Sequence, residues 1–199
     1  MRKGLYFSFL IMAANAFELW YPLISWVRRH RVRFDSSVTP DEIHDHFMRL
    51  ALEEAEKAGK RAEVPIGATV VRKSGDDTFE VLSRASNRVE RDNDASAHAE
   101  LLALRRAAKA IGNWRLLNCT LYSTLEPCPL CLSATQAFRV ESLVYGANDL
   151  RLGAVETYVR LLDYEHPFHN VTNVLGGVRK EQSADMLRGF FRQRRSKCK

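Results

Sequence analysis

His98-Ala99-Glu100 and, further along the chain, Pro127-Cys128-Pro129-Leu130-Cys131 are the two stretches that decide how this sequence folds. Imidazole and thiolate groups are preferred ligands of zinc, which takes four ligands in a tetrahedral arrangement. The Cys-x-x-Cys spacing lets both sulfur atoms of one turn reach the same metal ion. With His98 as a third ligand from a distant segment, one coordination position stays open. Catalytic zinc sites keep such a position for water, whereas structural sites are closed by four protein ligands.

Glu100 supplies a carboxylate that the metal does not need as a ligand. Zinc in such a site lowers the pKa of a bound water to about 7. A neighbouring carboxylate can take the proton from that water and later deliver it to a ring nitrogen and a leaving amine. General acid–base catalysis of this kind contributes about 100- to 10,000-fold. Glu100 also lies at the start of a predicted helix over 99–111, where the helix dipole favours an anionic group.

The combination of the two stretches is more specific than either alone. A Cys-x-x-Cys pair by itself also occurs as a redox pair or as half of a structural zinc knuckle. A His-x-Glu upstream of Pro-Cys-x-x-Cys is the signature of zinc-dependent nucleobase deaminases. The sequence therefore predicts a zinc enzyme that removes an amino group from a base by hydrolysis.

Composition and charge are compatible with a nucleic-acid substrate. The chain has 199 residues, of which 46% are hydrophobic and 27% charged, and its net charge is +6. That suits one globular domain with an extension. Basic residues crowd the C-terminal end, where a helix could contact phosphates; they are Arg188, Arg192, Arg194, Arg195, Lys197 and Lys199. We expect Phe190 and Phe191 to anchor this helix to the core rather than to stack on bases. A mildly basic enzyme or a solvated charged tail is the alternative interpretation.

Residues 1–38 have the pattern of a targeting presequence. A short basic start precedes an apolar run over 5–14 and an Ala-x-Ala site at Ala14-Asn15-Ala16, which is the plan of a signal peptide. Residues 17–38 are rich in arginine and poor in acids, as transit peptides are. Together they resemble the bipartite plastid presequences of algae with complex plastids. We predict a plastid location, with a cytoplasmic location as the alternative. An uncleaved amphipathic extension or a weak membrane anchor also remains open.

The apolar stretch is too short to predict a stable membrane span. Glu18 and Pro22 interrupt it before the roughly 20 residues that a span needs. We therefore expect no stable membrane association once the presequence is removed.

Residues 39–199 alternate helical and strand patterns. Thr39 and Glu42 form a capping box that starts a helix at Pro40. We expect this helix to end near Gly59. His44 and His46 are expected at its surface. Strands are predicted over 66–71, 79–86, 120–125, 142–145 and 171–175, and further helices over 99–111, from Cys128, over 154–162 and from 181. The first two strands form a hairpin. This order predicts an α/β fold of three layers, α-β-α, with a mixed central sheet of about five strands and helices on both faces.

Over about residues 43–195 the chain resembles the tRNA adenosine deaminases of bacteria and organelles, in the cytidine-deaminase-like superfamily. The matching stretches are Glu63-Val64-Pro65-Ile66-Gly67-Ala68, Asn87-Arg88, Gly112-Asn113-Trp114-Arg115-Leu116, Thr124-Leu125-Glu126-Pro127-Cys128, Tyr145-Gly146-Ala147, Gly153-Ala154, His166-Pro167-Phe168-His169, Gly176-Gly177-Val178 and Phe190-Phe191-Arg192. The segment over 166–169 is most similar to the plastid branch. His166 and His169 are expected to order a loop.

The resemblance implies a function and a set of roles. A homodimer would bind a tRNA anticodon stem-loop and convert the wobble adenosine to inosine, mainly in the arginine tRNA with anticodon ACG. Each subunit would hold one zinc ion through His98, Cys128 and Cys131, with Glu100 moving protons. Asn87 would hydrogen-bond the flipped base, the Ala99 backbone would help to read its edge, and Asp149 would lie near the backbone of the RNA loop. Glu126 is expected to have a structural or outer-shell role.

Some residues depart from the family pattern, and two other functions stay open. Leu132-Ser133-Ala134 follows Cys131 where a small pair is usual, Ala137-Phe138-Arg139 is also unusual, and Asn148 stands where arginine is common. A deaminase of free guanine, cytosine or their nucleosides would share the zinc site without needing the basic C-terminal end. A non-catalytic, zinc-containing RNA-binding subunit would tend to lose the carboxylate at position 100.

Overall fold

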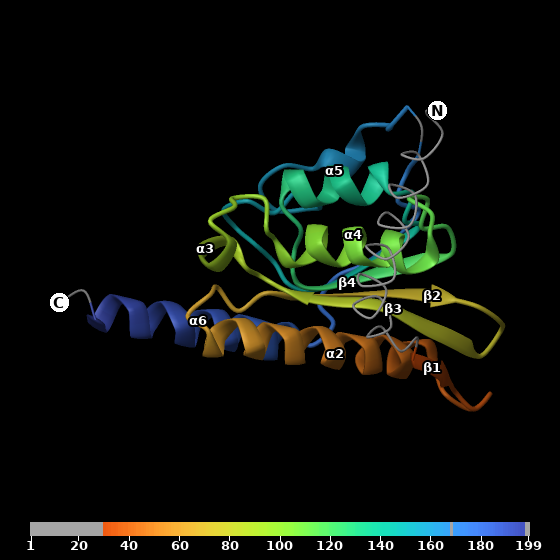
Figure 1. The fold of residues 1–199 in the computed structure, drawn as a ribbon, viewed down its shortest axis with the longest axis horizontal. Coiled ribbons are helices and arrows are strands. Elements are labelled where there is room, and N and C mark those ends of the chain that lie inside the picture. The colour runs from red at the N-terminus through yellow and green to blue at the C-terminus, as the bar shows by residue number, and fades with distance from the viewer. Residues whose placement is uncertain (1–29, 168, 198–199) are drawn as a thin grey trace, which may run out of the picture.

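The computed structural model describes residues 30–167 and 169–197. Within them, one mixed sheet lies between two layers of helices (Figure 1). Its strand order is β1-β3-β2-β4-β5-β6. The strands are β1 (His30–Arg33), β2 (Gly67–Lys73), β3 (Thr78–Ser86), β4 (Cys119–Leu125), β5 (Ser142–Ala147) and β6 (Asn173–Leu175). The helices are α2 (Pro40–Lys60), α3 (Val89–Asp92), α4 (Ala99–Ile111), α5 (Pro129–Ala137) and α6 (Lys180–Lys197). The three-layer α/β prediction is confirmed.

The connections decide the direction of each strand. β2 and β3 form the predicted hairpin and pair antiparallel, and β2 also pairs antiparallel with β4. β4 and β5 are joined through α5 and run parallel, as do β5 and β6. Parallel neighbours need such a crossover, whereas a hairpin needs only a turn. Because β4 is followed directly by α5, the carboxyl end of β4 lies where Cys128 begins that helix.

Alternation along the central strands builds two hydrophobic cores, one on each face of the sheet. Leu121 and Leu143 pack in the core under α4 and α5, whereas Tyr122 and Val144 pack in the core under α2. Successive strand residues point to opposite faces, so a strand covered on both sides is apolar throughout. α2 shows the complementary helical pattern, with Phe47, Met48, Ala51 and Leu52 buried on one stripe.

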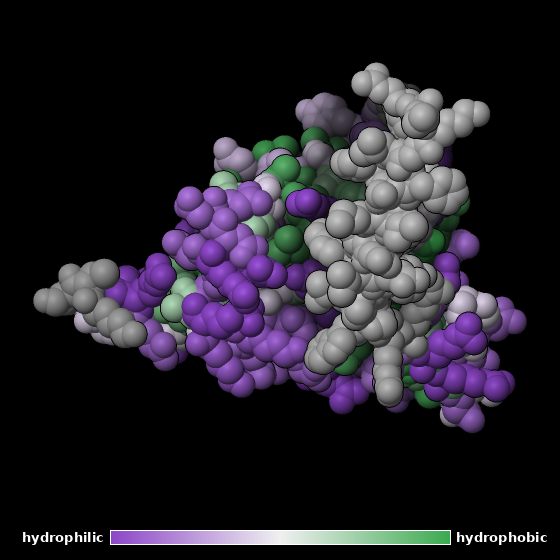
Figure 2. Space-filling model, in the orientation of Figure 1, coloured by the Kyte–Doolittle hydropathy of each residue, from purple (hydrophilic) through white to green (hydrophobic). Residues whose placement is uncertain are grey.

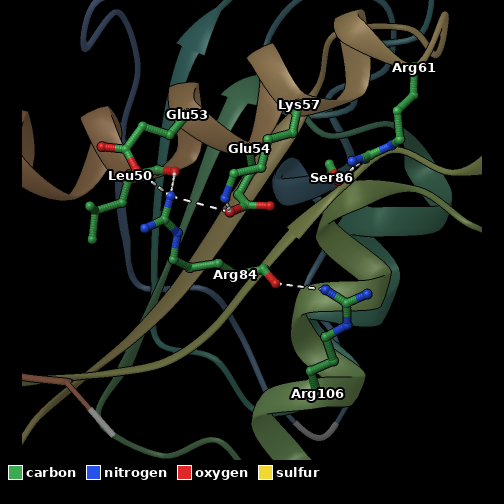
Figure 3. Close-up of polar contacts among 8 residues, drawn as sticks. All are labelled: Leu50, Glu53, Glu54, Lys57, Arg61, Arg84, Ser86 and Arg106. Carbon is green, nitrogen blue, oxygen red and sulfur yellow. Dashed lines mark hydrogen bonds and ion pairs between the residues drawn. The ribbon is translucent and has the colours of Figure 1, made fainter. Parts of the chain in front are cut away.

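Arg84 of β3 connects this sheet to both helical layers (Figure 3). Its guanidinium donates to the Leu50 carbonyl of α2 at 3.0 Å and lies 2.6 Å from the Glu53 carboxylate. Its own carbonyl accepts from the Arg106 guanidinium of α4 at 2.7 Å. β3 is thus tied to α2 and α4 by charge-assisted bonds, which are stronger than neutral ones.

The outer surface of α2 is polar. Figure 2 shows mostly hydrophilic residues over this helix, in keeping with its exposed Glu53, Glu56 and Lys60. Among the described residues, no helix combines the length and the apolar character that a membrane crossing requires.

The sheet has one strand more than expected, and that strand falls inside the predicted presequence. β1 pairs antiparallel with β3, with His30 opposite Val81 and Arg33 opposite Thr78. Phe34 follows it and makes edge contacts with Phe47 and Phe79 at ring-centroid distances of 5.8 and 5.7 Å. Residues 30–38 therefore contact the folded domain, whereas the rest of the predicted presequence, 1–29, lies outside the described residues.

The helix predicted over 154–162 is absent. This segment forms turns and a short 3-10 helix, η2 (Leu161–Asp163). The Glu126 carboxylate accepts the backbone N–H groups of Val155, Glu156 and Thr157 at 3.0, 2.8 and 3.2 Å. A buried carboxylate that gathers three consecutive N–H groups holds the chain in a loop, so the helical periodicity of the sequence is overridden.

Two further expectations about side chains need correction. His44 and His46 are both partly buried rather than at the surface. Nδ1 of His44 lies 3.0 Å from the Tyr122 hydroxyl, and the His46 ring packs edge-on against Phe34 and Phe47. Phe190 and Phe191 are half-buried on α6 rather than core anchors. α6 begins at Lys180 and packs mainly on β5 and less on α2 and β4, and many of its residues stay exposed.

Candidate active site

The three predicted metal ligands meet at the starts of two helices. His98 is the N-cap residue of α4 and Cys128 that of α5, both with extended backbone, and Cys131 lies in the first turn of α5. His98 Nδ1 is 3.5 Å from Cys128 Sγ and 3.4 Å from Cys131 Sγ. Pro129 at the first position of α5 costs no hydrogen bond, since that N–H has no partner within a helix. The predicted convergence is confirmed.

The donor set and its spacing fit zinc. The ligand atoms of His98, Cys128 and Cys131 all lie within 4.8 Å of one another. Tetrahedral zinc with bonds of about 2.0–2.3 Å sets its ligand atoms roughly 3.3–3.8 Å apart, which agrees with the two distances from His98. One imidazole and two sulfurs suit zinc better than the oxygen-preferring magnesium or calcium. This residue set is of the open, three-ligand type.

The cluster is prepared to supply a thiolate. A hydrogen bond from the Cys131 thiol, together with His98 beside it, lowers the pKa of Cys128 to about 4. The same contact with Cys128 raises the pKa of Cys131, and the contact of His98 with Cys128 raises the pKa of His98. Metal binding requires deprotonated sulfur, so Cys128 is available as a ligand at neutral pH.

Glu100 lies beside this cluster, on the first turn of α4. Its side chain is buried, with 4% of the residue exposed. Burial raises the pKa of Glu100 to about 7. A group with a pKa near the working pH can both accept and return a proton, which is what general acid–base catalysis needs.

A cavity of about 640 Å³ opens onto the cluster. His98, Glu100 and Cys128 line it, together with Asn87 and Asp149. Ala99 is fully buried and is not one of the lining residues, so its backbone contact with a substrate stays a prediction. The other lining residues come from the segment after α2, from α3, from Leu125 and Glu126 at the end of β4, from the loop over 148–152 and from α6.

Glu126 holds the loop that carries Asp149. Besides the three N–H groups already named, its carboxylate accepts the Asp149 N–H at 3.1 Å and the Thr157 hydroxyl at 2.7 Å. Only 1% of Glu126 is exposed. The expectation of a structural rather than catalytic role agrees with these contacts, because each one goes to the loop and none to the metal cluster.

Several residues of the cavity wall were not singled out in the sequence as site residues. Glu63, Leu152 and Phe191 line the cavity, and the guanidinium of Arg151 lies 5.6 Å from the Phe191 ring. Arg188, Arg192 and Arg195, predicted to contact phosphates, line the same wall. Helical periodicity does not identify Phe191 as a residue of the cavity wall, because its placement there depends on where α6 packs.

The comparisons with known proteins agree with this site. Residues 41–147 match the family model for the cytidine and deoxycytidylate deaminase zinc-binding region. The tRNA-specific adenosine deaminase of Agrobacterium fabrum is 44% identical over 150 residues, which cover 75% of this chain and 95% of that relative. The chain belongs to the family of tRNA-specific adenosine deaminases.

Two further members of this family show how far the similarity extends. A solved structure from a study of A-to-I editing by tRNA:A34 deaminases at the wobble position has a TM-score of 0.65 and 43% identity, over 71% of this chain and 99% of that one. The chloroplastic tRNA(adenine(34)) deaminase of Arabidopsis thaliana is 37% identical over 184 residues, which cover 85% of this chain and 13% of that much longer relative. The resemblance to tRNA adenosine deaminases is confirmed, whereas its plastid branch stays a prediction.

Proposed function

We propose that this protein hydrolyses the amino group of the wobble adenosine in a tRNA anticodon loop and leaves inosine, with the arginine tRNA of anticodon ACG as its main substrate. The observation that carries this proposal is the cavity itself. It joins a zinc-type ligand set and a buried carboxylate to a wall of arginines from α6. The family to which the chain belongs supports the same activity.

His98, Cys128 and Cys131 would hold the zinc ion, which supplies an activated water when it is bound. Glu100 takes a proton from the water that adds to carbon 6 of adenine. The same carboxyl group gives this proton to the ring nitrogen next to carbon 6. It then carries a second proton from the added hydroxyl to the amino group, and the carbon–nitrogen bond breaks to release ammonia. Its burial keeps bulk water from competing for these protons.

The wall of the cavity is suited to single-stranded RNA. Arg188, Arg192 and Arg195 line it, and arginine contacts with phosphates supply much of the affinity for nucleic acids. Asn87 and Asp149 lie on the wall where a base and its backbone would enter. Taking a base out of a loop costs little because it is already unpaired. These roles of Asn87, Ala99 and Asp149 are part of the proposal.

A deaminase of free bases is the alternative within the same chemistry. It would use the zinc ligands and Glu100 but would gain nothing from several arginines at the cavity wall. A non-catalytic RNA-binding subunit is the alternative of another class. The buried Glu100 carboxylate, which lines the cavity beside the ligand cluster, argues against it, because a structural zinc site needs no proton carrier next to its ligands.

The substrate class can be tested with a panel. The zinc-loaded protein is incubated with an ACG anticodon stem-loop, free guanine, cytosine, adenine and adenosine, and ammonia release is measured. The proposal expects release from the stem-loop only, together with a gel shift that weakens as salt rises. Release from guanine or cytosine, without release from the stem-loop, would establish the free-base alternative. A stem-loop shift without any ammonia release would favour the non-catalytic subunit.

A homodimer with one zinc ion per subunit is the second part of the proposal. Leu150, Leu152 and Tyr158 lie on the loop next to the cavity and are 83, 53 and 62% exposed. Several large exposed apolar groups on one loop are typical of a protein interface. Light scattering after gel filtration should give twice the monomer mass, and elemental analysis should give one zinc per chain. A monomer that deaminates the stem-loop at full rate would contradict the dimer.

Action in the plastid is the third part, supported by the pattern of residues 1–38 and by the chloroplastic relative. Because β1 pairs with β3, we place the processing site before His30 rather than at residue 38. Sequencing the N-terminus of the protein isolated from its native cells tests this. An N-terminus at Met1, with the protein in the cytosolic fraction, would favour the cytoplasmic alternative.

A further inference from the structure

We propose that Glu63 is a positioning residue that fixes the orientation of the Asn87 side-chain amide in the cavity. The inference rests on the proposed function, in which Asn87 contacts the target base. Glu63 follows α2, Asn87 follows β3, and both line the cavity with Glu100. Their contact therefore joins two segments of the cavity wall that are far apart in the sequence.

The two oxygens of Glu63 have different partners. Oε1 accepts the backbone N–H of Arg91 at 2.7 Å. Oε2 accepts from Asn87 Nδ2 at 3.3 Å and lies 3.4 Å from the backbone nitrogen of Glu90, which donates to it. The side chains of both Glu63 and Asn87 are buried, with 1% and 4% of these residues exposed. A buried carboxylate that accepts three N–H groups is fixed in place.

This carboxylate permits one orientation of the amide. An ionised carboxylate only accepts hydrogen bonds, whereas a side-chain amide has one donor end and one acceptor end. Glu63 therefore holds the Nδ2 end of Asn87 toward itself. The reversed amide would set an acceptor oxygen against an acceptor oxygen. The main chain of Asn87 is also held, since its N–H donates to the Ile66 carbonyl at 3.0 Å.

A fixed amide presents one pattern of donor and acceptor to whatever enters the cavity. Enzymes that act on a flipped base read it by hydrogen bonds to its edge. A site built around such bonds discriminates strongly, because a mismatched base leaves buried polar groups unpaired. Glu63 thus acts through Asn87 on the choice and the placement of the base, and it does not touch the reacting atoms.

Glu63→Gln is the informative substitution. The shorter bond, from the Arg91 N–H, would keep the glutamine oxygen at the Oε1 position. The glutamine NH₂ would then face Asn87 and the Glu90 N–H, donor against donor. The Asn87 amide would turn over to accept from it, and the pattern it presents to the cavity would be reversed. The variant has almost the same shape as the native protein, so folding and zinc binding are expected to be retained.

A double-mutant cycle separates positioning from a merely structural role. Glu63→Gln, Asn87→Ala and the double variant are compared with the native chain for kcat/KM on the ACG stem-loop. Glu63→Gln alone should lower kcat/KM by about 10- to 100-fold, the effect of one buried bond left unmade. In the Asn87→Ala background the same substitution should change kcat/KM less than about twofold. Glu56→Gln, an equal charge change at an exposed position of α2, is the control and should behave as the native chain.

Three results would overturn the proposal. One is an unchanged kcat/KM in Glu63→Gln with zinc bound. Another is an equal loss in the native and Asn87→Ala backgrounds. If Glu63→Gln loses zinc or its melting transition, the cycle is repeated with Glu63→Asp, which keeps a carboxylate. Equal losses of kcat/KM from Glu63→Asp in the native and Asn87→Ala backgrounds would be the third overturning result. A native chain that does not act on the stem-loop would instead refute the proposed function.

Discussion

Cys131 and Cys119 make a matched pair for testing the metal site at the scale of single residues. Both are buried, but only Cys131 lies in the ligand cluster. Burial raises the pKa of Cys119 to about 12, so that thiol stays neutral. Cys131→Ala removes one of three ligands and should lower the zinc content per chain by more than about tenfold, whereas Cys119→Ala should keep it. Elemental analysis after gel filtration measures this. A zinc content per chain in Cys131→Ala equal to that of the native protein would contradict the assigned ligand set.

His44 gives the fold a predictable response to acid. Burial lowers the pKa of His44 below its ordinary value of about 6.5. Nδ1 of the neutral ring makes a hydrogen bond with the Tyr122 hydroxyl, which stays protonated because burial raises the pKa of Tyr122. The unfolded chain therefore binds a proton more readily, and the contribution of His44 to stability is complete above about pH 6.5 and lost as the pH falls toward its folded pKa.

Melting temperatures measured between pH 7.5 and 5.5 test this response. We expect the melting temperature of the native chain to fall more over this range than that of His44→Gln. The glutamine side chain cannot titrate and can still hydrogen-bond with the Tyr122 hydroxyl. Both proteins carry zinc, so that acid effects at the metal site cancel. Equal declines in the two proteins would show that His44 does not contribute.

At the scale of elements, the loop over 149–157 depends on Glu126. Five hydrogen bonds from this loop end on one buried carboxylate. Although burial alone raises the pKa of Glu126, these bonds hold it below its ordinary value. Glu126→Gln sets an NH₂ group against N–H donors and should lower the free energy of unfolding by about 1–3 kcal/mol. Urea unfolding measures this, and limited proteolysis should show faster cleavage within 149–157.

Glu165→Gln is the control for this loop, because it makes the same charge change at an exposed position nearby. It should leave both measurements as they are in the native chain. An intact loop and unchanged stability in Glu126→Gln would mean that the backbone turns hold the segment without the carboxylate.

The same loop shows where sequence patterns stop being informative. The helix over 99–111 was predicted with its correct bounds, because apolar spacing, His98 as the cap position and Gly112 as the stop all agree. The ligand cluster was predicted because its residue types and spacings are set by zinc. The helix predicted over 154–162 was wrong, since a distant carboxylate takes its N–H groups. Glu63 was quoted only as part of a motif, because its role depends on a contact with Asn87 that no local pattern encodes.

At the scale of the whole molecule, β1 adds a sixth strand and covers one edge of β3. A chain that begins at His30 keeps this pairing and the Phe34 contacts, whereas one that begins at Thr39 loses both. We expect the shorter chain to be less stable by about 1–3 kcal/mol, the sum of a few cross-strand and aromatic pairs. Denaturant unfolding of the two chains measures the difference.

Phe34→Ala in the longer chain separates the two contributions. It should reproduce part of the loss, because the strand pairing remains while the aromatic contacts are removed. Equal stability of the chains beginning at His30 and Thr39 would mean that β1 contributes nothing, and a processing site at residue 38 would then be compatible with the fold.

The central claim is that the cavity deaminates the wobble adenosine with Glu100 as the proton carrier. Its most direct test is to incubate the full-length arginine tRNA of anticodon ACG with the zinc-loaded native chain or with Glu100→Ala, and to sequence the products. We predict inosine at the wobble position alone with the native chain. Glu100→Ala should bind zinc and tRNA equally well but convert it at least about 100-fold more slowly. Conversion by Glu100→Ala at the native rate, or no inosine from the zinc-loaded native chain, would contradict the account.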